Sequence, residues 1–199
     1  MVTLADTADR ILDVAEQLIQ TRGYTGFSYA DISASVGITK ASIHYHFPTK
    51  ADLARSLAQR HRRAFAVRVS GLEQEAADPG ELLERYVGLY QETLRSGDHM
   101  CLYGMLAAAA HTLPESVYAE VNGFFADQLE WLAGVLGRGR DAGRLEFTGS
   151  SAGQAKLLLA ALEGAMLVSR SRRDVGYFTE VLGRLVAGLW ARQGVAHAV

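Results

Sequence analysis

The sequence predicts an all-α fold of about nine helices, arranged as an N-terminal three-helix helix-turn-helix domain followed by a C-terminal helical domain. Apolar residues recur with helical spacing along nearly the whole chain. No stretch of useful length alternates as a strand does, and no segment repeats. Glycine, proline and capping residues divide the helical pattern into separate segments.

The composition is that of an ordinary folded protein. Hydrophobic residues make up 49% of the 199 residues and charged residues 21%, and the net charge of -2 excludes a globally basic nucleic-acid coat. The acidic N-terminus lacks the features of a secretory signal. The apolar stretch 157–168 contains Glu163 and is too short to span a bilayer. With Cys101 as the single cysteine, we expect a cytoplasmic protein without disulfides or membrane partners.

Four helices are predicted in the first 60 residues. The apolar face of the first is formed by Ile11, Leu12, Ala15, Leu18 and Ile19. The predicted boundaries of these helices are set by Gly23, by the Ser28–Asp31 capping box, by Gly37, by Thr39 and Pro48, and by the Thr49–Asp52 capping box.

The remaining helices are longer. Their predicted starts and ends are Asp78–Pro79, Ser96–Asp98, Pro114 and Ala142–Gly143, followed by two final helices over residues 151–172 and 175–192.

The segment from Ser28 to Phe47 has the size and turn chemistry of a helix-turn-helix. In its second helix, Ile43 and Phe47 lie four residues apart and can anchor one face inward. The other side chains then point outward, as a helix in a DNA major groove requires. Lys40 and Ser42 can reach base edges or phosphates there. Residues Tyr45, His46, Thr49 and Lys50 suit contacts with phosphates.

Charge is distributed unevenly in this region. Residues 1–60 contain six basic and six acidic side chains, and four of the acids lie in the first helix. Residues 32–51 contain no acid and carry two lysines and two histidines. A locally positive surface suits DNA, although short capped helices with polar faces are also common in proteins that bind none.

The stretch ILDVAEQLIQTRGYTGFSYADISASVGITKASIHYHFPTKADL, residues 11–53, resembles the TetR family of transcription regulators. The matching pieces follow in order and spacing and cover nearly all of that family's DNA-binding domain. The sequence departs from the commonest pattern at His44, where many members carry tyrosine.

The resemblance implies a regulator with a DNA-binding domain over residues 5–65 and an effector-binding and dimerisation domain over 66–199. It implies a repressor that leaves a double-stranded, inverted-repeat operator when a small molecule binds. By position, Ser28 and Tyr29 would contact phosphate, Thr39, Lys40, Ala41, Ser42 and His44 would face bases, and Tyr45, His46 and Lys50 would hold the DNA backbone.

The segment 157–168 is apolar on nearly every side and therefore needs cover on two faces. We expect a homodimer built from the last two helices of each chain, with a monomer as the alternative. The candidate interface residues are Leu158, Ala161, Leu162, Gly164, Ala165, Phe178, Leu182, Leu185 and Leu189.

An apolar or amphipathic effector of unknown identity is expected in the C-terminal domain. The candidate pocket residues are Tyr86, Tyr90, Cys101, Tyr103, Met105, Phe124 and Trp131, although residues of these types are more often ordinary core. Cys101 could be an oxidant sensor or a small buried residue.

Other functions find weaker support in the residues. The Asp98-His99-x-Cys101 cluster is a weak metal signal without a second cluster, and Cys101 with His111 lacks an orienting acid. We therefore expect no metal, no cofactor and no enzymatic activity. The competing class is a helical small-molecule-binding or scaffolding protein that has lost DNA binding.

Overall fold

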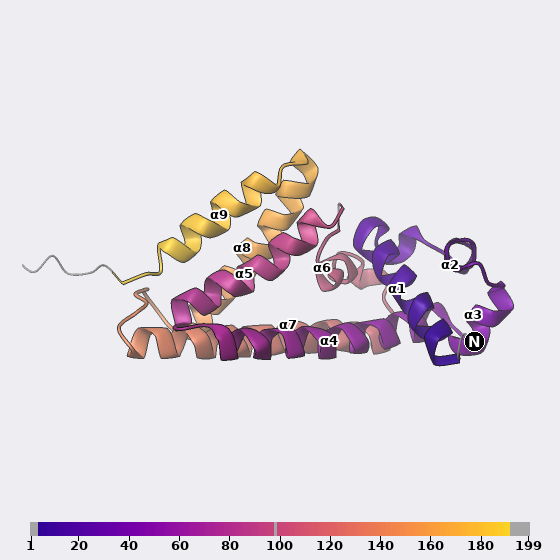
Figure 1. The fold of residues 1–199 in the computed structure, drawn as a ribbon, viewed down its shortest axis with the longest axis horizontal. Helices are drawn as coiled ribbons and strands as arrows, with labels where there is room; N and C mark the ends of the chain where they lie inside the picture. Colours follow the sequence, from indigo (N-terminus) through magenta and orange to yellow (C-terminus); the bar gives the residue numbers. More distant parts are fainter. Residues whose placement is uncertain (1–3, 98, 192–199) are drawn as a thin grey trace, which may run out of the picture. The chain divides into compact units, whose positions relative to one another are not determined.

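The computed structural model describes residues 4–97 and 99–191 and is drawn in Figure 1. The prediction of an all-α fold is confirmed. In chain order the described residues form α1 (Leu4–Arg22), the 3-10 turn η1 (Tyr24–Gly26), α2 (Tyr29–Val36), α3 (Lys40–His46), α4 (Lys50–Glu75), α5 (Pro79–Arg95), α6 (Leu102–Ala107), the 3-10 turn η2 (Ala110–Thr112), α7 (Glu115–Asp141), α8 (Ser151–Arg172) and α9 (Val175–Ala187).

The chain divides into two compact units. The N-terminal unit comprises Met1–Arg68 and Arg95–Phe125, and the C-terminal unit comprises Val69–Leu94 and Ala126–Val199. Helices α4 and α7 supply residues to both units. The segment 95–125, which the sequence grouped with the C-terminal domain, belongs to the same compact unit as α1, α2 and α3.

Helix α1 ends where the sequence predicts, and helices α2 and α3 begin and end where it predicts. The predicted apolar face of α1 is buried, and Gly23 ends the helix with a positive φ of 78° while its N–H donates to Ile19 O. Gly37 ends α2 in the left-handed conformation, with φ 76° and ψ 35°. A residue with a side chain would be strained at either position.

Helix α6 joins the N-terminal helices in the N-terminal unit. The Met100 N–H, just before α6, donates to the Gln20 carbonyl near the end of α1 at 3.2 Å. The core here is aromatic. The rings of Tyr103 and Phe124 stack at 3.8 Å, and the Phe65 ring meets Phe124 edge-on at 5.4 Å. Short α6 therefore gains its stability from packing.

His61 of α4 lies inside this aromatic cluster, stacked on Phe65. Within the part of the chain that the structure describes, its Nδ1 is buried without a hydrogen-bond partner, and its Nε2 lies 3.6 Å from Glu16 Oε1. Burial, reinforced by the positive charges of Arg60 and Arg68, lowers the pKa of His61 to about 4. Burial raises the pKa of Glu16. His61 is therefore neutral at pH 7.

The C-terminal unit contains α5, α8, α9 and the second part of α7. Helices α8 and α9 lie side by side (Figure 1). Asp78 caps α5 by accepting from the N–H groups of Gly80 and Glu81, as the sequence predicts, and its other carboxylate oxygen accepts from Arg144 at 2.6 Å. The cap is thereby tied to the link between α7 and α8.

Helix α9 ends at Ala187, before the predicted end at residue 192, which lies outside the described residues. The chain turns after α9 and forms an antiparallel bridge between Leu145 and Trp190. The Glu146 N–H donates to the Leu189 carbonyl at 2.7 Å. These contacts come from a distant segment, which is why periodicity alone extends the helix too far.

Helix α8 is longer than the apolar stretch on which the sequence argument rested. Over Ser151–Arg172 it is long and apolar enough to cross a membrane by length and composition. The core helix of a soluble protein passes the same test. Length and composition therefore do not distinguish a membrane-spanning helix from a core helix.

Two glycines of α7 give a matched test of packing. A Cβ at Gly139 would lie 2.4 Å from Leu145 Cδ1, and Leu145 is only 2% exposed. Gly134 is exposed, and a Cβ there would make only an ordinary contact. We expect Gly139→Ala to lower the free energy of unfolding by about 1–3 kcal/mol. Gly134→Ala should raise it by up to about 1 kcal/mol. Urea unfolding at one protein concentration checks both, and equal effects would contradict the packing at Gly139.

Stability should fall below pH 6.5 because His61 accepts a proton in the unfolded chain before it does so in the fold. Its pKa drops from 6.5 to about 4 on folding, so the penalty begins near pH 6.5 and is complete near pH 4. Between pH 7 and pH 5, protonation of His61 in the unfolded chain should lower the free energy of unfolding by about 2 kcal/mol. In urea unfolding, His61→Phe should flatten this part of the pH profile. An unchanged slope in His61→Phe would show that another group titrates.

Candidate nucleic-acid interface

Helix α3 is held at both ends and on one face. Thr39 caps its start, with Oγ1 accepting from Ser42 N–H at 3.1 Å. At its end the Phe47 N–H donates to Ile43 O at 2.8 Å, and Pro48 follows. Ile43 is fully buried and Phe47 is 7% exposed. The remaining side chains of α3 are exposed or half-buried, so the predicted inward anchors and outward polar face are both present.

Helix α2 supports the turn that precedes α3. Ser28 and Asp31 form the predicted capping box, and hydrogen bonds from Ser28 lower the pKa of Asp31. Arg10 of α1 donates to the Val36 carbonyl at 2.8 Å, at the last residue of α2. The sequence pattern does not predict this structural role for Arg10. It fixes the end of α2 on α1.

The Tyr29 hydroxyl forms a hydrogen bond within the protein. The Tyr29 OH donates to Phe47 O at 2.8 Å, and its ring lies 4.7 Å from the His44 ring. Burial is the main cause that raises the pKa of Tyr29 to about 12, so the hydroxyl keeps its proton. The sequence-based role for Tyr29 was a phosphate contact. Its hydroxyl instead joins α2 to the end of α3.

The Lys50 ammonium is likewise turned inward. It donates to Phe27 O, lies 4.0 Å from the centre of the Phe27 ring, and lies 4.9 Å from the centre of the Tyr24 ring. Burial lowers the pKa of Lys50. Its expected partner was a phosphate. In this conformation its partners are a carbonyl and two aromatic rings.

His44 occupies a defined place on the exposed side of α3. Its Nδ1 lies 3.0 Å from the Pro48 carbonyl oxygen. Tyr45, the next residue, is 73% exposed, and its ring meets the His46 ring edge-on at 5.3 Å. From the sequence, Pro48 was expected only to end the helix. Its carbonyl oxygen also orients the His44 side chain.

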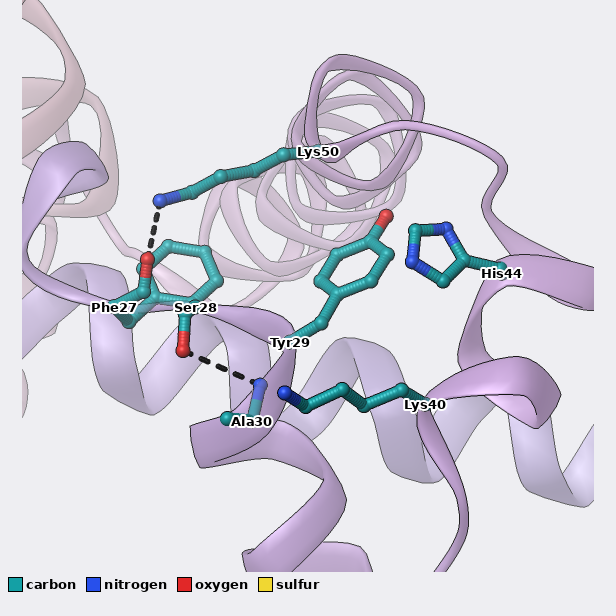
Figure 2. Close-up of a pocket in the computed structure, with 7 residues that line it drawn as sticks. All are labelled: Phe27, Ser28, Tyr29, Ala30, Lys40, His44 and Lys50. Atoms are coloured by element: carbon teal, nitrogen blue, oxygen red, sulfur yellow. Dashed lines mark hydrogen bonds between the residues drawn. The ribbon is translucent and has the colours of Figure 1, made fainter.

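A surface hollow of about 420 Å³ lies between the start of α2 and α3. Figure 2 shows the side chains that line it. Lys40 and His44 line it from α3, one helical turn apart, and Lys50 lines it from α4. The other lining residues are Phe27, Ser28, Tyr29 and Ala30. The hollow is therefore walled by rings and carries two lysines.

The ion pairs of α1 agree with the locally positive charge that the sequence predicts around α3. Three acids of α1 pair with Arg60 of α4, which lies 3.5 Å from Asp9, 2.8 Å from Asp13 and 3.2 Å from Glu16. Residues 32–51, which include all of α3, contain no acid. A polyanion approaching α3 meets no carboxylate from that stretch of chain.

The candidate effector residues fall into two groups. Tyr86, Tyr90 and Trp131 belong to the C-terminal unit, whereas Cys101, Tyr103, Met105 and Phe124 belong to the N-terminal unit. In the C-terminal group, the Tyr86 hydroxyl donates to Gln128 Oε1 at 3.0 Å and lies 3.0 Å from the Tyr90 hydroxyl. Tyr86, Tyr90 and Gln128 are all buried. Gln128 was not among the candidate pocket residues. A glutamine that lies among apolar positions of a predicted helix is the signal that could have identified it.

Cys101 is 6% exposed and takes the N-cap position of α6. Its sulfur accepts from Gly104 N–H at 3.4 Å. Cys101 is therefore a buried residue of the N-terminal unit. Asp98, which belonged to the alternative metal cluster, lies outside the described residues.

Comparison with known proteins places this geometry in context. Residues 11–57 match the family model described as bacterial regulatory proteins, tetR family. A TetR-family regulator from Agrobacterium tumefaciens has a crystal structure with a TM-score of 0.92 and 37% identity, and the match covers 95% of this chain and all of that one. A TetR regulator from Legionella pneumophila gives a TM-score of 0.82 and 33% identity, with 90% and 95% covered.

A curated relative extends the comparison. The HTH-type transcriptional repressor NemR of Escherichia coli is 28% identical over 177 residues, which are 85% of this chain and 86% of NemR. The matches to the two solved structures run far beyond the helix-turn-helix. From α1 to the last helices, this chain belongs to the TetR family of bacterial transcription regulators.

Proposed function

We propose that this chain is a cytoplasmic homodimeric repressor that binds an inverted-repeat DNA operator through α3 and leaves it when a small apolar or amphipathic effector binds. Two observations support repression. The chain belongs to the TetR family, and NemR, a relative along most of its length, is named a repressor.

The observation that carries the proposal is the exposed polar face of α3. Capping by Thr39 and burial of Ile43 hold the helix in place, and its stretch of chain carries no acid. A helix of this kind can enter the major groove without rearranging, and groove entry brings its side chains to base edges.

We assign the exposed side chains by their position on α3. Lys40 and Ser42, near its start, read bases together with Thr39, Ala41 and His44. Tyr45 and His46, near its end, contact phosphates. Ser28 has a positioning role, because its hydroxyl already donates to Asp31 Oδ2 and accepts from the Ala30 N–H. We now give Tyr29 and Lys50 positioning roles, because their polar groups are bonded to Phe47 and Phe27.

The proposed dimer surface shifts within α8 and α9. Several candidate interface side chains are already buried within the single chain and cannot reach a partner: Leu158, Leu162, Ala165, Phe178, Leu182 and Leu189. Leu157 and Leu167 of α8 are 63% and 62% exposed, and Gly164 lies between them in sequence with open space around it. We propose that this exposed strip of α8, with half-buried Ala161 and Leu185, meets the partner.

We place effector recognition around Tyr86 and Gln128. Their hydrogen bond lies in a buried aromatic setting that includes Trp131, 4.9 Å from the Tyr86 ring. A buried polar pair among rings is the kind of lining that orients an amphipathic ligand. Release then requires that the effector favours a conformation in which the two α3 helices no longer fit successive grooves.

Substitutions on α3 should separate sequence reading from backbone binding. Lys40→Ala should change the preferred base at one position per half-site, with a loss of about 1–3 kcal/mol of discrimination. Tyr45→Phe should weaken binding to all sequences by a similar factor, because a phosphate contact carries no sequence information. Competition binding against operator variants measures both effects. Unaltered base preferences in Lys40→Ala would remove Lys40 from the base-reading set.

Gly164→Glu should dissociate the dimer without unfolding the chain, because a side chain at Gly164 meets nothing within 4 Å in the single chain. Light scattering after gel filtration should give about twice 21.6 kDa for the parent protein and 21.6 kDa for the variant. Operator binding should fall with dissociation. Gly134→Glu, at an exposed glycine of α7, is the control and should remain dimeric. A parent protein that runs as a monomer at micromolar concentration rules out the dimer.

A further inference from the structure

His44 is oriented by contacts on two sides. Its Nδ1 lies 3.0 Å from the Pro48 carbonyl oxygen, and its ring packs against the Tyr29 ring at 4.7 Å. Tyr29 is itself held by the hydrogen bond from its hydroxyl to Phe47 O. In Figure 2 the His44 ring stands at the edge of the hollow, facing Tyr29. The ring is therefore held in place in the free protein.

The contact with Pro48 determines which ring nitrogen carries the proton. A carbonyl oxygen can only accept a hydrogen bond, so Nδ1 must be the donor. In a neutral imidazole the other nitrogen, Nε2, then has a lone pair and no hydrogen. His44, which is exposed on α3, consequently presents a hydrogen-bond acceptor.

We infer that His44 reads an exocyclic amino group in the major groove, either N6 of adenine or N4 of cytosine. These are the hydrogen-bond donors that base edges present there, whereas guanine and thymine present acceptors. At one position of each half-site, His44 selects adenine or cytosine over guanine or thymine on the contacted strand. This inference rests on the proposed DNA binding and assigns a chemical preference to one residue of it.

Lys40 supplies an internal contrast. It lies one helical turn before His44 and lines the same hollow. A lysine ammonium only donates, so it suits guanine O6 and N7. At the hollow, α3 therefore presents a donor from Lys40 and an acceptor from His44, and the two residues select opposite classes of base at neighbouring positions.

The test begins with selection of binding sites from a randomised double-stranded DNA library, using the full-length protein. The same selection with His44→Phe identifies the position that His44 reads, because phenylalanine keeps a ring beside Tyr29 and lacks both nitrogens. Lys40→Ala is the control and should relax a different position.

The selected operator is then altered one atom at a time. Each adenine is replaced by unsubstituted purine, and each cytosine by 2-pyrimidinone, which removes the amino group alone. In a separate series, carbon replaces N7 of the purine in the same base pair. Loss of one amino group should weaken binding by the parent protein about fivefold, the low end for a base contact. The N7 replacement at that base pair should change it by less than about twofold. His44→Phe should respond to neither change at that position.

The outcomes are distinct. If no sequence is enriched, the proposed function fails and the inference fails with it. A second outcome is that sites are enriched although no amino deletion in a half-site weakens binding by the parent protein more than binding by His44→Phe. In that case DNA binding stands and the inference is overturned. Sensitivity to the N7 replacement in place of the amino deletion would mean that the ring donates, which also overturns it. If His44→Phe binds poorly, a parent protein that responds to no amino deletion still overturns the inference.

Discussion

The structure depends on keeping a seven-residue helix in place. Helix α3 is too short to be stable alone, since isolated helices of fewer than about 12 residues are marginal in water. Its order comes from neighbours: the Thr39 cap at one end, the turn at Phe47 and Pro48 at the other, and the buried side chain of Ile43. Ile43 lies on the side away from the exposed polar face, and the other contacts lie at the two helix ends. The same arrangement therefore stabilises the helix and leaves that face available.

Polar side chains around α3 act mainly as internal supports. Arg10 holds the end of α2, Tyr29 connects α2 to Phe47, and Lys50 connects α4 to Phe27. Each places a hydrogen bond from a long side chain on a backbone carbonyl that follows or ends a helix or turn. Such bonds fix the angle between short helices, which apolar contacts alone leave looser. A face ordered before DNA arrives loses less entropy on binding.

Much of this organisation could be predicted because it is local. Helix ends at Gly23, Gly37 and Pro48 follow from backbone chemistry that single residues dictate. The early end of α9 depends on the Leu145–Trp190 bridge, and the inward turn of Lys50 depends on rings 23 and 26 residues away. Periodicity also shows that α8 is apolar all round without showing which side its own chain covers. For that reason Leu158 and Leu162, chosen as interface residues, lie in the core while Leu157 and Leu167 are exposed.

We propose that α3 enters the major groove in each of two half-sites. Methylation protection measures this directly, because dimethyl sulfate attacks guanine N7, which lies in the major groove. On a selected operator, the protein should protect guanines in two symmetric half-sites whose centres lie about 34–36 Å apart, or a multiple of that spacing. Binding that leaves N7 reactivity unchanged throughout the bound region would contradict the claim.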